Sequence, residues 1–497
     1  MTTVAASTAA AAPAPAGAAR SAARRRGVLF ACCLAQFMSV LDISAMNIAL
    51  PSVQKALGFT TANLMWVVTA YSLALSGCLL LGGRLADLLG QRRMMLIGIA
   101  AFTAASLIGG TAVSGPVLVL ARCLQGVAAS VMVPATLAVL TSTFTEPGER
   151  AKAMGLWSAV AGGGASFGGI AGGLLTSFAS WRWTLLVNVP LGLLLLVIGS
   201  LSVERSRPAA RVGSPDVLGA GAVTLGLMAL VAGIGESGKY GWGSAPVVTA
   251  LALAAALLLF FVLNEAKLAR DPLVPLVVFR NRALSVTNAV GAFSCAAFYT
   301  TVYFTPLLLQ QVLHASALRA SLLLAPQSLC VLISARGVAR FVPRLGTRTV
   351  LSAGLASASC GLLWLSRATE HATYLGSLIG PCVLLGCGWG LIMTGSTVAA
   401  VSGVPRDQTG LAAGLINTNR QLGGAIGIAV LAGVATARSA ALLSGQEGTA
   451  SASAQRHAAA AGYDRGYLVG ALLMALAFAV ARVLPGRARG GERVVRP

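Results

Sequence analysis

Long apolar runs separated by short polar segments fill this chain from residue 27 to residue 484. The runs are close to 20 residues long and do not alternate between apolar and polar positions, so they predict membrane-spanning helices rather than barrel strands. Only helices and closed barrels satisfy every backbone polar group within lipid. We count fourteen candidate spans, at residues 27–50, 63–82, 94–113, 116–140, 153–177, 183–202, 215–235, 246–264, 284–311, 320–341, 349–366, 374–400, 408–437 and 463–484.

Composition supports this pattern. The 497 residues are 56% hydrophobic and only 10% charged, whereas soluble domains carry about 25% charged residues. The sequence therefore predicts an all-α polytopic protein whose main partner is the lipid bilayer. Its nine cysteines fall inside apolar runs and its three histidines are scattered, so we expect no metal site. No cofactor is expected either, and the ATP-binding pattern Gly-x-x-x-x-Gly-Lys-Ser/Thr is absent.

The basic residues indicate how the chain is oriented. With the N-terminus inside, most of the 36 Lys and Arg residues lie in cytoplasmic segments, as the positive-inside rule requires. This asymmetry favours an even number of spans with both termini in the cytoplasm. Topology then explains the net charge of +22, and we expect no nucleic-acid partner. Residues 1–26 are predicted to be a disordered cytoplasmic segment, and residues 485–497 a cytoplasmic tail.

The turn between the second and third runs is unusually specific. Residues 83–93 read Gly-Arg-Leu-Ala-Asp-Leu-Leu-Gly-Gln-Arg-Arg. A plain positive-inside anchor would explain Arg92 but not Asp87 between Gly83 and Gly90. The segment closely resembles the loop between spans two and three of major facilitator transporters. That resemblance implies a conformational switch formed by these four residues, in which Asp87 docks at the cytoplasmic start of the thirteenth span, residues 408–410.

A weaker copy of this turn follows the tenth run, at residues 339–348, with Gly346 in the place of Gly90. The repeat predicts two six-span halves, at residues 27–202 and 284–484, with two inserted helices and their linkers at residues 203–283. Parallel halves with internal inverted repeats are the logic of the major facilitator fold. We therefore expect that fold with fourteen helices arranged as six, two and six.

Asp42 is the one acidic residue that the predicted spans place well inside the membrane. A carboxylate there costs about 2.5–3.5 kcal/mol, which makes it a functional candidate. Residues 41–51, Leu-Asp-Ile-Ser-Ala-Met-Asn-Ile-Ala-Leu-Pro, resemble the first-span motif of the fourteen-span drug:proton antiporters, with Ser44 the conservative departure. The resemblance implies that Asp42 carries the proton, while a purely structural ion pair stays open. Asn47 is assigned to a possible substrate cavity.

The partner expected for Asp42 is Arg122. Residues 122–126, Arg-Cys-Leu-Gln-Gly, resemble the Arg-x-x-Gln-Gly motif that is tied to proton coupling in the family. A rise of 1.5 Å per residue places Asp42 and Arg122 at a similar depth, about 10–14 Å below the outer surface. The alternative for Arg122 is a hydrogen-bond network that packs helices. Gln125 is assigned to the possible substrate cavity.

Two further motifs complete the candidate site. In the fifth span, Gly168, Gly172 and Gly173 belong to a stretch that resembles the antiporter motif Gly-x-x-x-Gly-Pro-x-x-Gly-Gly, with a glycine, Gly169, at the proline position. Small residues allow close helix packing, and the resemblance implies that this face closes a gate. In the thirteenth span, three residues are assigned to the possible cavity: Asn417, Arg420 and Gln421. Arg420 is either satisfied by neighbouring polar groups or meets an anionic or polar substrate.

The resemblance covers residues 27–484 through five motifs in the expected order. It implies a proton-coupled antiporter, not an enzyme, that exports drugs, antibiotics or amphipathic metabolites across a bacterial inner membrane and works as a monomer. A major facilitator importer or a transporter of non-drug metabolites is the alternative. A proton entering down 100 mV releases about 2.3 kcal/mol. With one deep carboxylate, we expect low proton stoichiometry and a preference for neutral, zwitterionic or anionic compounds over dications.

Overall fold

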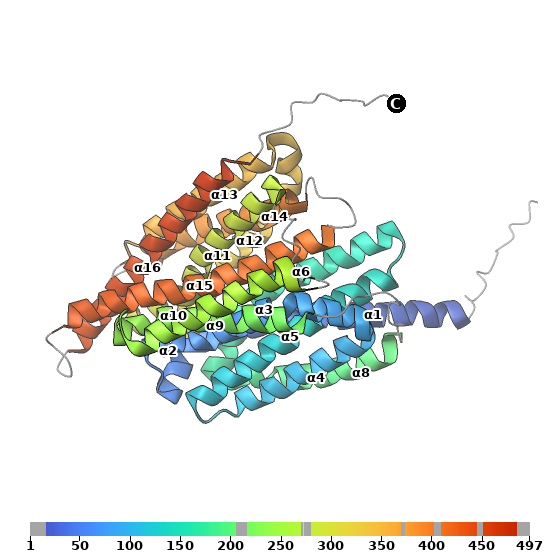
Figure 1. Cartoon of the computed structure of the whole chain (residues 1–497), viewed down its shortest axis with the longest axis horizontal. Helices are drawn as coiled ribbons and strands as arrows, with labels where there is room; N and C mark the ends of the chain where they lie inside the picture. Colours follow the sequence, from blue (N-terminus) through green and yellow to red (C-terminus); the bar gives the residue numbers. More distant parts are fainter. Residues whose placement is uncertain are drawn as a thin grey trace, which may run out of the picture.

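The computed structural model describes residues 16–204, 216–269, 272, 280–368, 373–401, 409–444 and 451–484. Regular structure within these ranges is helical. Figure 1 shows two helix bundles, with a pair of helices, α9 and α10, lying along them. The helices pack mainly through Ala, Leu and Val side chains buried between them.

The first bundle contains α1 (Ala16–Leu57), α3 (Trp66–Leu89), α4 (Gln91–Gly110), α5 (Gly115–Thr143), α6 (Pro147–Phe178) and α8 (Asn188–Ser202), with the short helices α2 (Thr61–Leu64) and α7 (Trp183–Leu186). The pair that follows is α9 (Val217–Tyr240) and α10 (Ala245–Leu263), which continues as a π-helix, η1 (Asn264–Leu268). The second bundle contains α11 (Arg282–Leu307) with η3 (Leu308–Val312), α12 (Ala317–Leu345), α13 (Thr347–Leu365), η4 (Tyr374–Leu378) with α14 (Ile379–Val401), α15 (Thr409–Leu443) and α16 (Ala452–Ala481).

Twelve helices in the described part are long and apolar enough to cross a membrane. The count becomes thirteen with α3, whose parts Trp66–Leu79 and Leu81–Leu89 meet at a bend of 51°. The remaining predicted span, residues 153–177, falls on α6, where the described apolar stretch covers Phe167–Phe178. The protein is therefore an all-helical membrane protein with about twelve to thirteen spans.

Helix α1 begins earlier than its composition predicts. Residues 16–26 form its first turns rather than a disordered segment, because Ala and Arg are strong helix formers. Near this end, Arg24 donates to the Ser202 carbonyl at 2.9 Å, and Arg25 pairs with Glu149 at 2.7 Å. These contacts tie α1 to α8 and α6. Residues 1–15 and the predicted tail at 485–497 lie outside the described residues.

The backbone bears out the predicted match between Gly90 and Gly346. Gly90 has a φ of 94° and Gly346 a φ of 80°, values that side-chain-bearing residues rarely adopt. Gly90 separates α3 from α4, and Gly346 separates α12 from α13. The two bundles therefore make the same glycine-dependent turn at corresponding places.

The bundles touch near the end of α1. Gln310 Nε2 donates to the Ile48 carbonyl at 2.9 Å, and Gln311 Nε2 donates to Gln54 Oε1 at 2.6 Å. Helix α6 also packs against α12, and α15 packs against α3. Figure 1 shows the bundles diverging from this region toward the end where α1 begins.

Candidate functional site

Asp42 of α1 and Arg122 of α5 meet in the interior of the first bundle. Arg122 Nη1 donates to Asp42 Oδ2 in a buried ion pair, with side-chain exposures of 1% and 0%. The contact predicted from their equal depth is thus confirmed. Two charges this deeply buried are tolerated only when they pair with each other and with further hydrogen-bonding groups.

Two amide side chains complete the shell around Asp42. Asn188 Nδ2 donates to Asp42 Oδ1 at 2.8 Å, and Gln125 Nε2 donates to the same oxygen at 3.0 Å. Gln125 also accepts from Arg122 Nη1 at 2.8 Å. Gln125 is fully buried, so the structure places it in this network rather than on a cavity wall. Gln125 and Arg122 are three residues apart on α5, so they share one face of this helix.

Helix α3 holds the arginine from the other side. Arg122 Nε donates to the Val67 carbonyl at 2.9 Å, and its guanidinium carbon lies 4.5 Å from the centre of the Tyr71 ring. The Tyr71 hydroxyl lies 3.0 Å from the Ser39 hydroxyl of α1. Gly126 permits this approach, since a Cβ there would lie 2.4 Å from the Tyr71 carbonyl oxygen. The glycine of the Arg-x-x-Gln-Gly motif therefore positions its arginine.

Sequence reasoning did not assign Asn188, Tyr71 or Ser106 to this network. Ser106 of α4 lies 2.8 Å from Gln125 Nε2. Asn188 had a usable signal, because it is a polar residue inside an apolar run and must find a hydrogen-bond partner there. Ser106 gave no such signal, since a serine in an apolar helix can also bond to its own backbone, and Tyr71 gave none because its largely apolar ring fits a helix core by packing alone.

Two glycines of α6 form its contact with α1 beside this network. A Cβ at Gly168 would lie 2.9 Å from the Leu41 Cα, and one at Gly172 would lie 2.5 Å from the Ala45 Cα. Side chains larger than hydrogen would therefore push the two helices apart. These glycines hold α6 against the segment of α1 that carries Asp42.

Gly173 packs against a different helix from Gly168 and Gly172. A Cβ at Gly173 would lie 2.9 Å from the Ala317 carbonyl oxygen of α12, so this glycine packs between the bundles. Close by, the Leu318 backbone N–H donates to the Ser177 hydroxyl at 3.1 Å. Gly169 has nothing within 4 Å of its Cβ position. The predicted gating stretch therefore contacts α1 with one face and the second bundle with another.

Asn47 lies one turn beyond Asp42 on α1. Its side chain is 3% exposed, and neither its amide nitrogen nor its amide oxygen has a hydrogen-bond partner among the described residues. Buried polar groups in native proteins nearly always have a partner. Asn47 is therefore a place where a hydrogen-bonding ligand or water would be stabilised.

Arg420 lies between α15 and α14 in the second bundle. Its Nη2 donates to the Met393 carbonyl at 2.9 Å and to the Thr397 hydroxyl at 3.1 Å. It also donates to the Ser396 hydroxyl. Its Nε is buried without a partner, and none of the ion pairs among the described residues includes it. Arg420 is thus held by neighbouring polar groups, one of them a backbone carbonyl, while Asn417 and Gln421 are not among its contacts in the described part of the chain.

Asn417 and Gln421 lie one turn apart on α15 but differ in their surroundings. Asn417 is exposed, whereas Gln421 Oε1 accepts from the Tyr299 hydroxyl of α11 at 2.7 Å. Residues four apart on a helix would normally share a face, but here only Gln421 packs toward α11. Asn417 is thus the accessible member of this predicted set.

Among the residues assigned to the conformational switch at 83–92, the described contacts with other helices are few. Arg92 Nη2 donates to the Ser200 carbonyl of α8 at 2.7 Å, which joins the start of α4 to the end of α8. Gly83 meets ordinary packing, with its nearest neighbour, Pro134 Cβ, 3.9 Å from its Cβ position. Asp87 is exposed. Of its predicted docking site, Gln408 lies outside the described residues.

A second carboxylate lies farther inside a helix than the sequence predicted. Asp464 is more than three turns into α16, since this helix begins at Ala452 rather than at the predicted residue 463. The Ala-rich stretch before it favours helix. Asp464 Oδ1 is buried without a partner among the described residues. Unlike Asp42, it has no arginine beside it in any of the ion pairs described.

Comparisons with known proteins agree with this geometry. Residues 32–428 match the Major Facilitator Superfamily. The cephamycin export protein of Amycolatopsis lactamdurans is 41% identical over 406 residues, 81% of this chain and 83% of that protein. The puromycin resistance protein of Streptomyces alboniger is 39% identical over 453 residues, 90% and 87% of the two chains. A crystal structure of an auto-inhibited POT-family peptide transporter has a TM-score of 0.67 and 16% identity, covering 94% and 99%, and shows the shared fold.

The two bundles of apolar helices, the first of which encloses the buried ion pair, and the family match together make this a multi-pass membrane transport protein rather than an enzyme. The chain belongs to the major facilitator superfamily. Its relatives include proteins named for antibiotic export and for antibiotic resistance.

Proposed function

We propose that this protein exports amphipathic antibiotics or drugs across a bacterial inner membrane in exchange for protons. The observation that carries the proposal is the fully buried Asp42, paired with Arg122 and bonded to two amides. Export by relatives at about 40% identity supports the direction of transport. Because this carboxylate is buried, a change in its charge alters the stability of the helix packing around it.

The proposed coupling step is protonation of Asp42. In the charged form, its oxygens accept from Arg122, Gln125 and Asn188. A proton on Asp42 cancels its charge and leaves the Arg122 guanidinium buried without its anion, which is strongly unfavourable. Movement of α1 relative to α5 would relieve that cost. Occupancy of Asp42 by a proton would therefore bias the arrangement of the first bundle.

Helix α1 also connects the proton site to the proposed cargo path. The tight contacts of Gly168 and Gly172 would move α6 together with α1, and Gly173 would transmit this movement to α12. Asn47 and the exposed Asn417 supply polar groups for cargo. Arg420 would be held mainly by α14, through its three contacts there, rather than by anionic cargo.

We further propose fourteen spans, with α6 as the additional one. The halves would be residues 27–202 and 284–484, separated by α9, α10 and their linkers at 203–283. Both termini would be cytoplasmic, which puts the contacts of Gln310 and Gln311 on the outer side and makes this an inward-facing arrangement. The functional unit would be a monomer. Asp87 would act as a latch whose contact changes in each cycle.

The decisive experiment compares Asp42→Asn with Asp464→Asn in everted membrane vesicles. Dye accumulation driven by a pH gradient should fall to background in Asp42→Asn, because the proton carrier is lost, and stay near wild type in Asp464→Asn. Gradient-free exchange of the same dye should survive in both and reports on folding. Normal uphill transport by Asp42→Asn would remove this residue from the mechanism. Accumulation in right-side-out vesicles instead would indicate an importer.

A second experiment tests the stoichiometry. One proton moving down 100 mV supplies about 2.3 kcal/mol, enough for a gradient of about fifty-fold for a neutral compound. Exchange of one proton for a dication would work against the same potential. We expect strong uphill export of a neutral dye and weak export of a matched dicationic dye. Equal export of both would mean that more than one proton moves per cycle, and Asp464 would be the next residue to test.

A further inference from the structure

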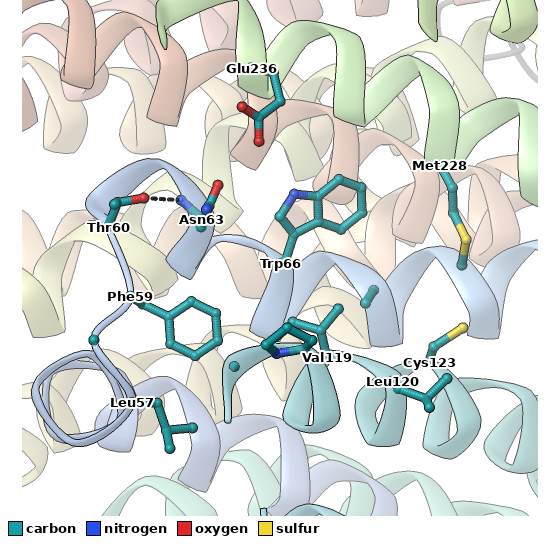
Figure 2. Close-up of a pocket in the computed structure, with 14 residues that line it drawn as sticks. Leu57, Phe59, Thr60, Asn63, Trp66, Val119, Leu120, Cys123, Met228 and Glu236 are labelled. Carbon is teal, nitrogen blue, oxygen red and sulfur yellow. Dashed lines mark hydrogen bonds between the residues drawn. The ribbon is translucent and has the colours of Figure 1, made fainter. Parts of the chain in front are cut away.

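A pocket of about 690 Å³ lies between the inserted helix α9 and the first bundle (Figure 2). Its walls come from the segment after α1, the starts of α3 and α5, and one face of α9. None of its lining residues belongs to the shell of Asp42. The lining residues are Leu57, Gly58, Phe59, Thr60, Asn63, Trp66, Ala70, Gly115, Pro116, Val119, Leu120, Cys123, Met228 and Glu236.

Glu236 is the one charged side chain among these lining residues. Figure 2 shows its carboxylate on the Trp66 side of the pocket, with Phe59 on the far wall and the Met228 thioether farther along. None of the ion pairs among the described residues includes Glu236. A carboxylate next to an indole ring attracts a cation through its charge and through the ring face. The remaining wall is mostly apolar, so the pocket suits an ammonium group attached to an apolar body.

One wall of the pocket continues onto an exposed apolar face of α5. On α5, Val117, Leu120, Leu124 and Val127 are 37%, 58%, 43% and 41% exposed. Their spacing of three or four residues puts them on one face of the helix, and an exposed apolar face on a membrane protein contacts lipid chains. Leu120 belongs both to this face and to the pocket wall. An occupant would therefore come from the bilayer.

The depth of the pocket is that of lipid headgroups. Its lining includes the connecting residues Gly58 and Thr60, and Glu236 lies one turn before α9 ends at Tyr240. Exposed Tyr240 and Trp242 follow directly, and such aromatics mark the membrane–water interface. The acidic residue, Glu236, thus lies near the interface, and the apolar wall on α5 lies deeper. This is the order of headgroup and chain in a phospholipid.

We propose that this pocket binds an amine-bearing phospholipid, with its ammonium group on Glu236 and Trp66 and its chain along α5. Helix α9 supplies the charge, so the inserted helices create the site. An anionic headgroup without an amine would be repelled by the carboxylate. This binding requires no transport step and would stand even if export in exchange for protons were disproved.

The test uses quenching of Trp66 fluorescence by brominated lipids. The full-length protein is placed in phosphatidylcholine-free bilayers that contain a small fraction of brominated phosphatidylethanolamine or brominated phosphatidylglycerol, and the signal of Trp66→Phe is subtracted. We expect phosphatidylethanolamine to quench at about three- to tenfold lower mole fraction, the range that one ion pair and one cation–π contact supply. Glu236→Gln should abolish this preference, and Glu236→Asp should retain part of it.

The matched control is Glu146→Gln, an exposed carboxylate at the start of α6 that makes no capping bond. It should leave the preference unchanged. Unchanged quenching by phosphatidylglycerol shows that each variant is folded around Trp66. Equal quenching by the two lipids in wild type, or a preference that survives in Glu236→Gln, would overturn the proposal. So would a response of Trp66 to a soluble hydrophobic amine without any lipid preference.

Discussion

Each bundle holds an arginine within a helix, the buried Arg122 and the half-buried Arg420, but their charges are compensated in different ways. Arg122 in the first bundle pairs with Asp42 and bonds to Gln125 and a backbone carbonyl. Arg420 in the second bundle bonds only to neutral oxygens of α14 among the described residues, and its Nε has no partner. The first site is electrically balanced, whereas the second carries a net charge.

This difference separates two roles that one residue type can have. A balanced pair can be unbalanced by a single proton, so its charge state can change within a transport cycle. A lone guanidinium stays charged at every accessible pH and offers a constant field. The bundles share a helix arrangement and a turn at Gly90 and Gly346, so the contrast lies in side-chain chemistry.

The largest effect is expected from removing Arg122. Arg122→Gln leaves the Asp42 carboxylate buried without its cation and should lower the free energy of unfolding by about 3–5 kcal/mol. Titration of purified protein with a denaturing detergent would measure this loss. The double variant Asp42→Asn with Arg122→Gln should lose less than the sum of the single variants, because the two residues are coupled. Additive losses would mean that the pair is not a unit.

An intermediate effect is expected where the bundles are alike. Gly90→Ala and Gly346→Ala each place a Cβ on a backbone with positive φ, which costs about 1–3 kcal/mol. Thermal unfolding in detergent should show similar losses for both. Gly83→Ala is the control, because Gly83 lies within a helix and a Cβ there would make only an ordinary van der Waals contact, 3.9 Å from Pro134 Cβ. Clearly unequal losses at Gly90 and Gly346 would show that the turns are not equivalent.

The smallest effect is expected at Arg420. Arg420→Gln loses hydrogen bonds to α14 but also removes a half-buried charge that has no ion pair among the described residues, so the free energy of unfolding should change by less than about 1.5 kcal/mol. The same detergent titration makes the comparison with Arg122→Gln direct. A loss as large as that of Arg122→Gln would reveal an anionic partner and end the contrast. Selective loss of anionic cargo transport would instead identify Arg420 as a cargo contact.

The sequence was sufficient for the helices because lipid imposes a strong constraint on composition. Every predicted span falls on a helix, and the apolar runs placed most of them within a few residues. The ends were less predictable. Helix α1 begins at Ala16 and α16 at Ala452, because Ala-rich segments continue a helix beyond the membrane, where hydropathy gives no signal.

The pair at the centre of the site was predictable from depth together with a motif. Asp42 is the one acid deep in a predicted span, and counting helical rise put Arg122, which its motif had singled out, at a similar depth. Gln125 was assigned to a cavity but lies inside the network, because sequence does not fix which way a helix face turns. The pocket at Glu236 could not be predicted, since it depends on where α9 packs against α3 and α5.

Helix α1 is 42 residues long, which makes it a rod of about 60 Å. Gly168 and Gly172 of α6 pack closely against Leu41 and Ala45 of α1, between the contacts that Arg24 and Gln54 make toward its two ends. If α1 rotates as a rigid body about this contact with α6, its two ends move in opposite directions. Any tilt that lifts Gln54 away from the second bundle must swing the Arg24 end in the opposite direction. Opposite faces of the membrane can thus be linked mechanically, without a chain of side chains passing the signal along.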